Sequence, residues 1–259
     1  MRQFMRIKNG ITLLVLLWLA VAPKIAEAQG VILFDEGHGQ RFLVEQEGSL
    51  NLSGLSGLFQ AESLQVRIGK EIITDKILAD VDGLVISGAF KPFTPPEISA
   101  ITDFVARGGR LCIMLHIGSP VANLLGKINV LISNGVVREQ VNLIEGNDLD
   151  FYIEKFTPHE LFEGIDRFKV YGGWALLNAK ENAEIIAATS PKAWIDLNRN
   201  NKRDNNSEME KSLGLVVAGR VGHGNFVVFG DDAIFQNRFL TEENILLGKN
   251  LAKWLKNKR

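Results

Sequence analysis

The sequence predicts an α/β fold in which a mostly parallel β-sheet is covered by helices on both faces. Short, continuously apolar segments at 31–34, 83–89 and 110–116 have the composition of strands that are buried on both sides. Segments with helical periodicity separate them, the clearest over 95–107. Apolar strands that alternate with helices are typical of a parallel sheet, because parallel neighbours need a long crossover connection.

The first half of the chain supplies these elements in order. The strand VILF (31–34) comes first, and leucine and phenylalanine side chains on one side of 49–60 predict a short helix after it. The alternating segment LQVRI (64–68) predicts a strand nearer the sheet edge. The apolar run 83–89 predicts another buried strand.

The best-marked helix follows this strand. The segment TPPE (94–97) combines a capping box with prolines at the first helical positions, and Gly108 and Gly109 end the apolar stripe behind it. A buried strand over 110–116 and a helix over 119–132 are predicted next.

The second half is predicted to be a β-rich extension. Its strand candidates are 168–171, 184–189, 193–197, 213–219 and 225–229. The last two are joined by a short polar, glycine-containing segment and predict a hairpin. A terminal helix is expected over 242–256, with Thr241 as its N-cap.

Residues 1–28 are interpreted as a signal peptide. A basic start is followed by the apolar stretch 11–22, by Pro23 and by the small-x-small pattern Ala26-Glu27-Ala28. The alternative is a membrane anchor, but a spanning helix needs about 20 apolar residues. No cysteine follows the apolar stretch, which argues against a lipoprotein. We therefore expect an exported protein, periplasmic or extracellular, that is cleaved after Ala28.

Composition narrows the function classes. Cleavage would remove four basic residues and one acidic residue, and would shift the formal net charge from −1 to −4. So weak a charge favours neither nucleic acid nor an anionic membrane surface as a partner. Cys112 is the only cysteine, so an intramolecular disulfide is excluded. No second apolar stretch is long enough to span a bilayer once the signal peptide is removed.

Polar residues follow several of the predicted strands. Right-handed crossovers bring the carboxyl ends of parallel strands to one edge of the sheet, where open α/β sheets bind their ligands. The predicted ligand-binding residues at this edge are Asp35, Glu36, His38, Gln40, Ser87, His116, Asp231 and Asp232.

His38 in the stretch DEGHGQ (35–40) is open to three interpretations. It can be part of a structural turn, a ligand contact, or an acid–base group with a neighbouring carboxylate. It can also be half of a metal site completed by His116 and Asp231 or Asp232. These residues have no diagnostic ligand spacing, so the metal signal is weak.

Three stretches together carry a family resemblance: DEGHGQ (35–40), TPPEISAITDFVARGGRLCIML (94–115) and GHGNFVVFGDDAIFQN (222–237). They resemble the class I glutamine amidotransferase-like superfamily, in an exported bacterial branch related to the gliding-motility ABC-transporter auxiliary protein and to the N-terminal domain of an intraflagellar-transport subunit. The resemblance implies one flavodoxin-like three-layer domain over 29–259. Several relatives are regarded as non-enzymatic binding modules, with sugar binding proposed for some.

Glutaminase activity is not expected. Amidotransferases carry a cysteine on the sharp turn after the strand that here is RLCIML, whereas this turn reads His116-Ile117-Gly118-Ser119. Cys112 lies inside the strand, where a thiol behaves as a small apolar group. Ser119 could be a displaced nucleophile, although Ser119-Pro120 is more typical of a helix N-cap.

The aromatic residues allow two readings. Trp174, Trp194, Tyr171 and Phe90 could form a sugar-stacking platform, although aromatic residues in apolar strands are more often core. Trp254 lies on the apolar side of the terminal helix and is predicted to be core.

Residues 196–208 match the spacing of a calcium loop. The predicted ligands are Asp196, Asn198, Asn200, Lys202 through its backbone carbonyl, Asp204 and Glu208. The match is incomplete, because Asn201 replaces the usual glycine at position 6 and Glu208 falls one residue late. Two interpretations of this segment remain: a structural Ca²⁺ site, and a solvated loop without metal.

These observations favour a non-catalytic binding or scaffold module of the cell envelope. Its ligand would lie at the carboxyl edge of the sheet, with a carbohydrate as one candidate and an envelope protein as another partner. The alternative is a hydrolase that uses His38 with Asp35 or Asp231 at the same edge.

Overall fold

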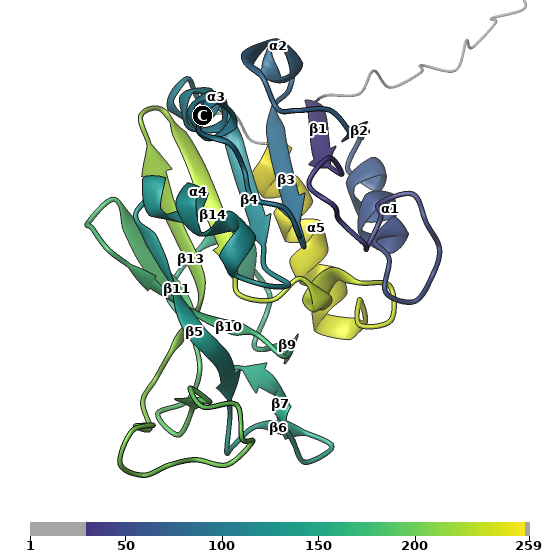
Figure 1. Cartoon of the computed structure of the whole chain (residues 1–259). Helices are drawn as coiled ribbons and strands as arrows, with labels where there is room; N and C mark the ends of the chain where they lie inside the picture. The colour runs from purple at the N-terminus through teal and green to yellow at the C-terminus, as the bar shows by residue number, and fades with distance from the viewer. Residues whose placement is uncertain (1–29, 257–259) are drawn as a thin grey trace, which may run out of the picture.

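The computed structural model describes residues 30–256, and the signal-peptide prediction falls outside this range. Helices and two β-sheets build the molecule (Figure 1). The helices are α1 (Ser53–Ala61), α2 (Asp75–Leu78), α3 (Pro95–Ala106), α4 (Ala122–Lys127) and α5 (Glu242–Lys256), with 3₁₀ turns η1 (Ser119–Val121), η2 (Glu160–Phe162) and η3 (Ala233–Phe235).

Five parallel strands form one end of the larger sheet, in the order β14-β4-β3-β1-β2, with β2 at the edge. They are β1 (Gly30–Asp35), β2 (Leu64–Gly69), β3 (Gly83–Ser87), β4 (Arg110–Met114) and β14 (Gly224–Phe229). All five were predicted as strands, with boundaries that differ by at most two residues. β1, β3, β4 and β14 are almost entirely buried, as their apolar runs indicate.

The prediction of a mostly parallel sheet is wrong. Within residues 30–256 the larger sheet has eleven strands, and the six other than these five pair antiparallel. They are β5 (Val130–Arg138), β8 (Lys155–Phe156), β10 (Trp174–Asn178), β11 (Ala183–Ala188), β12 (Trp194–Ile195) and β13 (Gly214–Val221). The reversal begins at the predicted hairpin, because β13 turns into β14 through a tight turn at Gly222, whose φ is 57°.

A second, three-stranded sheet lies below the first in Figure 1. It is antiparallel and consists of β6 (Leu143–Ile144), β7 (Asn147–Ile153) and β9 (Phe168–Tyr171). Only β9 was predicted. Its buried side chains, together with those of β7, join the core beneath the larger sheet.

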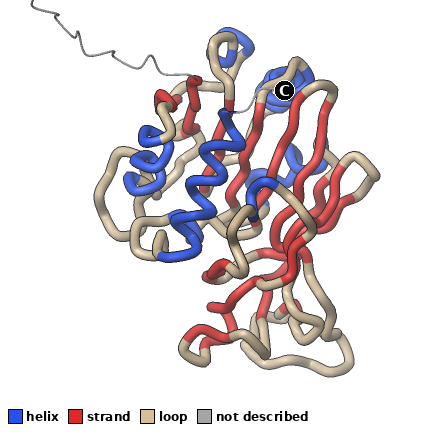
Figure 2. Tube along the Cα trace, turned by 180° about the vertical axis from the view of Figure 1, so that it is seen from behind, coloured by secondary structure: helices blue, strands red, loops and turns tan. Residues whose placement is uncertain are grey.

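The helices lie on both faces of the parallel strands (Figures 1 and 2). One core contains α1 and α5 side chains, among them Phe59 and Leu251. The other contains side chains of α2, α3 and α4, such as Ile101 and Leu124. Trp254 is 2% exposed in the first core, as predicted. The chain is therefore an α/β protein with a large mixed sheet.

The start of α3 is as predicted, whereas the helix expected over 119–132 is not. Glu97 caps α3 by accepting hydrogen bonds from the backbone N–H and the hydroxyl of Thr94, at 2.9 and 2.7 Å. After η1 and α4, Asn129 adopts a φ of 62° and ends the helix. The β-branched residues that follow it continue as β5, because they fit a pleated sheet better than a helix.

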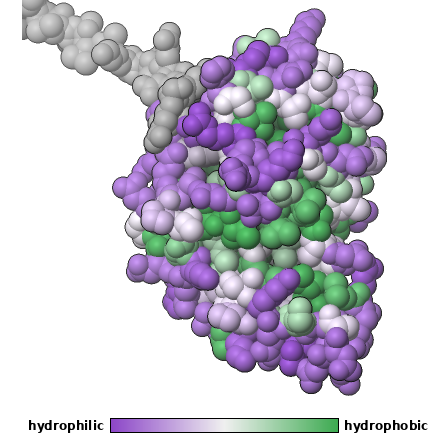
Figure 3. All heavy atoms as spheres, turned by 90° about the vertical axis from the view of Figure 1, so that its left-hand side faces the viewer, coloured by the Kyte–Doolittle hydropathy of each residue, from purple (hydrophilic) through white to green (hydrophobic). Residues whose placement is uncertain are grey.

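The side of the molecule seen in Figure 3 has a band of apolar residues between polar margins. Leu131 of β5 and Leu177 of β10 are cross-strand neighbours and are 50% and 55% exposed. Across residues 30–256, none of the helices has the length and apolar character required to cross a bilayer.

Candidate functional site

The strand-edge residues divide into two groups because side chains alternate along a strand. Asp35 shares a face of β1 with Leu33, which packs in the core beneath α3. Ser87 shares a face of β3 with Val85, which packs in the core beneath α1 and α5. The prediction placed these residues on one edge, and the structure separates them onto opposite faces of it.

The first group centres on His38. Its Nδ1 lies 2.9 and 3.0 Å from the two carboxylate oxygens of Asp35, and its Nε2 lies 3.0 Å from Oε1 of Glu97. The ring also stacks on Phe93, with centroids 3.8 Å apart. His38 is 6% exposed. Both ring nitrogens are therefore occupied, and neither is presented to a ligand.

The charge of His38 follows from these contacts. Burial is the largest single effect and lowers the pKa of His38, but the hydrogen bonds and charges of Asp35 and Glu97 together raise it above its usual value. An imidazolium that donates to two carboxylates ties the turn after β1 to the start of α3. The sequence signal for this was the capping box, although it did not identify Glu97 as the partner of His38.

Glu36 and Gln40 are also engaged inside the protein. Glu36 Oε1 accepts from the backbone N–H of Val44 at 2.9 Å. Gln40 donates to Oδ2 of Asp35 at 2.6 Å and accepts from the backbone N–H of His38 at 2.8 Å. This network organises the loop after β1 and leaves the second group as the more accessible one.

The second group centres on His116, whose side chain is 39% exposed. Its Nδ1 lies 3.1 Å from Oδ1 of the buried Asp232. Phe42 and Phe90 flank the ring, with centroids 4.8 and 5.5 Å away. Asp231 is buried beside Asp232 and accepts backbone hydrogen bonds from Tyr171 and Ala233. His116 is thus an exposed imidazole oriented from behind by a carboxylate.

Two ionisable groups of this cluster have shifted pKa values. The hydrogen bond to Asp232 raises the pKa of His116, and this outweighs the opposing effect of burial. Burial and the neighbouring charge of Asp232 raise the pKa of Asp231 to about 8. The cluster can therefore hold protons near neutral pH.

Ser87 and Asp232 each bring a buried polar atom that lacks a partner. The Ser87 hydroxyl and Oδ2 of Asp232 have no hydrogen-bond partner within residues 30–256. A Cβ atom on Gly88, whose φ is 57°, would lie 2.7 Å from the same Oδ2. The backbone thus approaches Asp232 closely, and the two unpaired atoms are buried, where a water molecule can satisfy them.

No activated nucleophile accompanies His116 in the described part of the chain. Cys112 is fully buried in β4, and burial raises the pKa of its thiol. Ser119 begins η1 itself and makes no capping hydrogen bond through its side chain, so the N-cap expectation is not met.

Of the four aromatic residues considered for a sugar-stacking platform, Trp194 is 4% exposed, whereas Trp174, Tyr171 and Phe90 are half-buried.

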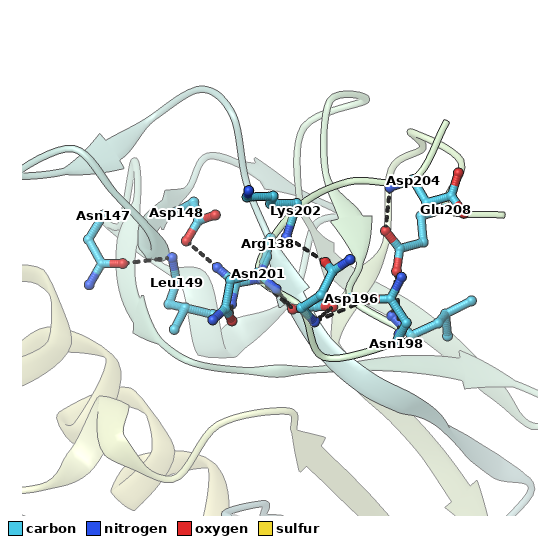
Figure 4. Close-up of polar contacts among 12 residues, drawn as sticks. Arg138, Asn147, Asp148, Leu149, Asp196, Asn198, Asn201, Lys202, Asp204 and Glu208 are labelled. Atoms are coloured by element: carbon cyan, nitrogen blue, oxygen red, sulfur yellow. Dashed lines mark hydrogen bonds and ion pairs between the residues drawn. The ribbon is translucent and has the colours of Figure 1, made fainter. Parts of the chain in front are cut away.

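The loop after β12 has the backbone conformation that the calcium-loop pattern implies (Figure 4). Asn201, which stands where such loops have glycine, adopts a φ of 61°. The side chains of Asp196 and Asn200 accept backbone hydrogen bonds from residues two to five positions ahead. Glu208 is buried and accepts from the backbone N–H groups of Leu197 and Asp204, at 2.8 and 2.7 Å.

Arg138 of β5 bonds to side chains of this loop and holds it against the sheet. Its guanidinium contacts Asp196 at 3.0 Å and Asp148 at 2.7 Å, and it also donates to the amide oxygen of Asn201 (Figure 4). The sequence did not indicate this role. Within residues 30–256, no three His, Cys, Asp or Glu side chains are grouped to hold a metal ion, so calcium here would depend on asparagine oxygens.

Neither a protein-family model nor a curated protein matches the chain. Among solved structures, the mmIFT52 N-terminal domain is similar with a TM-score of 0.69 and 17% identity, over 87% of this chain and 97% of that one. A ThuA-like protein from Bacteroides uniformis has a TM-score of 0.56 and 10% identity, over 91% and 94%. A cytoplasmic protein from Salmonella typhimurium has 0.55 and 15%, over 88% and 99%. The chain is thus similar in fold to glutamine amidotransferase-like proteins.

Proposed function

We propose that the protein is an exported binding or scaffold module of the cell envelope whose ligand lies beside His116 at the carboxyl edge of the parallel strands. One observation carries this proposal. His116 is exposed and backed by Asp232, yet among residues 30–256 no thiol or hydroxyl is hydrogen-bonded to it. Covalent catalysis needs a nucleophile within reach of its base. An exposed imidazole that is oriented by a carboxylate, with no nucleophile bonded to it, suits reversible binding.

A carbohydrate is the ligand class that these groups fit best. Sugars combine hydroxyl groups, which bond to imidazole and carboxylate, with apolar ring faces, which pack on aromatic side chains. Phe42 and Phe90 supply such faces next to His116. The exposed imidazole of His116 can bond to a sugar hydroxyl. The glycan of an envelope polysaccharide, or one on an envelope protein, would be the natural partner.

The competing function is a hydrolase in which His116, oriented by Asp232, activates a water molecule. The exposure of His116 favours this alternative over one based on His38, which is buried and has both ring nitrogens bonded to carboxylates. A screen of glycoside, ester and phosphate substrates against the wild type and His116→Ala separates the two. His223→Ala, which changes an exposed histidine in the β13–β14 turn, is the matched control.

We expect no turnover by any of the three proteins in this screen. In parallel, a glycan array should give a wild-type binding signal that is weaker in His116→Ala and unchanged in His223→Ala. Turnover that depends on His116 would replace the binding module with the hydrolase.

The proposal extends to the finer classification of the fold. The parallel strands β14-β4-β3-β1-β2, with helices on both faces, support a flavodoxin-like three-layer sandwich to which the antiparallel strands are added. We also propose that the chain belongs to the exported amidotransferase-like branch that the sequence resembles.

Export is tested through the processing of residues 1–28. Expressed from the full-length gene in a Gram-negative host, the protein should reach the periplasm with Gln29 as its first residue, as read by mass spectrometry. Ala28→Phe should leave the precursor uncleaved, because signal peptidase needs a small residue there. An uncleaved wild type in the membrane fraction would favour the anchor.

Calcium in the 196–208 loop is part of the same proposal. Asp196, Asn198, Asn200 and Asp204 would hold the ion through side-chain oxygens, and Lys202 through its carbonyl, an all-oxygen set of the kind Ca²⁺ takes. Glu208 falls one residue after the last ligand position and bonds to the backbone N–H groups of Leu197 and Asp204, so we assign it the support of the loop. When bound, calcium would neutralise the carboxylates and order the loop.

A further inference from the structure

A cavity of about 600 Å³ lies between the turn after β4 and the 196–208 loop. Its lining includes Ile117 and Ser119 from the turn, Asn134 from β5 and Trp174 from β10. The indole N–H of Trp174 donates to the backbone carbonyl of His116 at 3.0 Å, so the cavity borders the site proposed above. None of the predicted strand-edge ligands lines it.

The lining is positively charged, although the protein as a whole is not. Its charged residues are Arg138, Arg199 and Asp196. Arg138 is paired with Asp196 inside the lining and with Asp148 outside it. Arg199 is exposed, and no carboxylate in the described part of the chain forms an ion pair with it. An arginine without a partner at the mouth of a cavity suits a carboxylate.

The remaining lining has the composition of a sugar site. Trp174 is half-buried and held by its N–H, so its ring is available as a fixed apolar surface. The side chains of Ser119 and Asn134 are exposed and have no hydrogen-bond partner within residues 30–256, which leaves them free for ligand hydroxyls. Gly118 is packed tightly against Ile132 here, because a Cβ atom on it would lie 2.0 Å from Cδ1 of that side chain.

We infer that this cavity binds a pyranose ring that carries a carboxylate, a uronic-acid unit of an acidic polysaccharide. The ring packs on Trp174, its carboxylate pairs with Arg199, and its hydroxyls bond to Ser119 and Asn134. The inference rests on the proposed function and deepens it by stating the charge of the sugar.

The test compares each acidic sugar with its own neutral form. Trigalacturonate, triglucuronate and trimannuronate, and the methyl ester of each, are titrated into the exported protein by calorimetry and by tryptophan fluorescence. Trp194 and Trp254 are buried, so a fluorescence change reports on Trp174. At least one acid should bind, its ester should bind at least tenfold more weakly, and the difference should shrink at high salt.

Variants assign the effect to the cavity. Arg199→Gln should weaken the acid to the affinity of its ester and leave the ester unchanged, and Trp174→Ala should abolish both. Arg220→Gln changes an exposed arginine at a different cavity and should have no effect. The thermal midpoint of each variant shows whether it is folded.

Two sets of results would overturn the inference. If no acid binds, or if acid and ester bind equally in both wild type and Arg199→Gln, the cavity is not a uronate site. The proposed function stands in these cases provided that another glycan binds in a His116-dependent way. The proposed function has its own contradicting result, which is substrate turnover that depends on His116.

Discussion

The Nε2 atom of His38 lies 3.0 Å from Oε1 of Glu97, although 59 residues separate the two along the chain. This contact joins the first loop of the sheet to the N-terminus of α3. Glu97 accepts from the backbone N–H groups of Ile73 and Thr94 as well. One buried carboxylate therefore holds three segments, and His38 supplies a positive charge between it and Asp35.

His38→Ala should destabilise the protein in a pH-dependent way. The variant leaves two buried carboxylates without their partner, which costs about 3 kcal/mol of unfolding free energy. Because the folded state raises the pKa of His38, this stabilisation is complete below the unfolded pKa of about 6.5 and is lost as the pH rises through the folded pKa. Urea denaturation at pH 5.5 and pH 9 should give the larger difference at pH 5.5. His223→Ala is the control, and a difference that grows with pH would contradict the account.

Asp232→Asn should lower the pKa of His116. The hydrogen bond and the charge of Asp232 hold that pKa above its usual value, and asparagine can keep the bond but not the charge. An NMR titration of the imidazole signals measures the change, with His116→Ala used to assign the resonance. Asp103→Asn on the surface of α3 should leave the titration as it is. An unchanged His116 pKa in Asp232→Asn would show that Asp232 does not set it.

Calcium should raise the melting temperature of the wild type. A site with so few carboxylates is expected to bind with a Kd of about 10⁻⁴–10⁻³ M. Calcium at ten times Kd would add about 1.4 kcal/mol, or about 3–5 °C for a domain of this size. Asn198→Ala and Asp196→Ala should lose this rise, whereas Asn206→Ala should keep it. Asp196→Ala also breaks the pair with Arg138, so the comparison is made between calcium and chelator for each protein.

If calcium raises the melting temperature of the wild type and of Asp196→Ala equally, or of neither, the loop does not bind the ion. Arg138, through its ion pair with Asp196, would then be a cation of the protein itself that holds the loop.

Arg138→Ala should cost about 3–5 kcal/mol of unfolding free energy, because it leaves Asp196 buried without its counter-charge. Arg107→Ala removes an exposed pair with Asp75 of similar length and should cost less than about 1 kcal/mol. Guanidinium denaturation of the two variants measures both. An equal loss of unfolding free energy in the two variants would mean that burial does not strengthen the contacts of Arg138.

The elements that could be predicted were those whose signal is local. The apolar runs of β1, β3 and β4 and the capping of α3 depend on neighbouring residues, and they were found with small boundary errors. β5 was missed because the helical period of α4 continues into it, and only Asn129 marks the change. Apart from the β13–β14 hairpin, whose turn is local, the direction of the later strands depends on which partner strands they pair with, and no local pattern records that.

The candidate site shows the same division. That polar residues gather at the strand ends follows from topology, so Asp35, His38, His116 and Asp232 could be named from the sequence. Each polar side chain lies on one face of the sheet or the other, according to where its strand ends. The His38 group and the His116 group therefore lie on opposite faces. Arg138 and Glu97 became part of polar clusters through contacts over 58 and 59 residues, which only the folded chain brings together.

The most direct test of the binding account is to locate the ligand by NMR. A glycan that binds, titrated into ¹⁵N-labelled protein, should shift the Trp174 indole signal and the His116 ring signals first. The indole signals of Trp194 and Trp254 should stay in place, because these rings are buried. Shifts centred instead on His159 and His223, which line the cavity of about 660 Å³ that also includes Arg110, would contradict the central claim that the carboxyl edge beside His116 is the binding site.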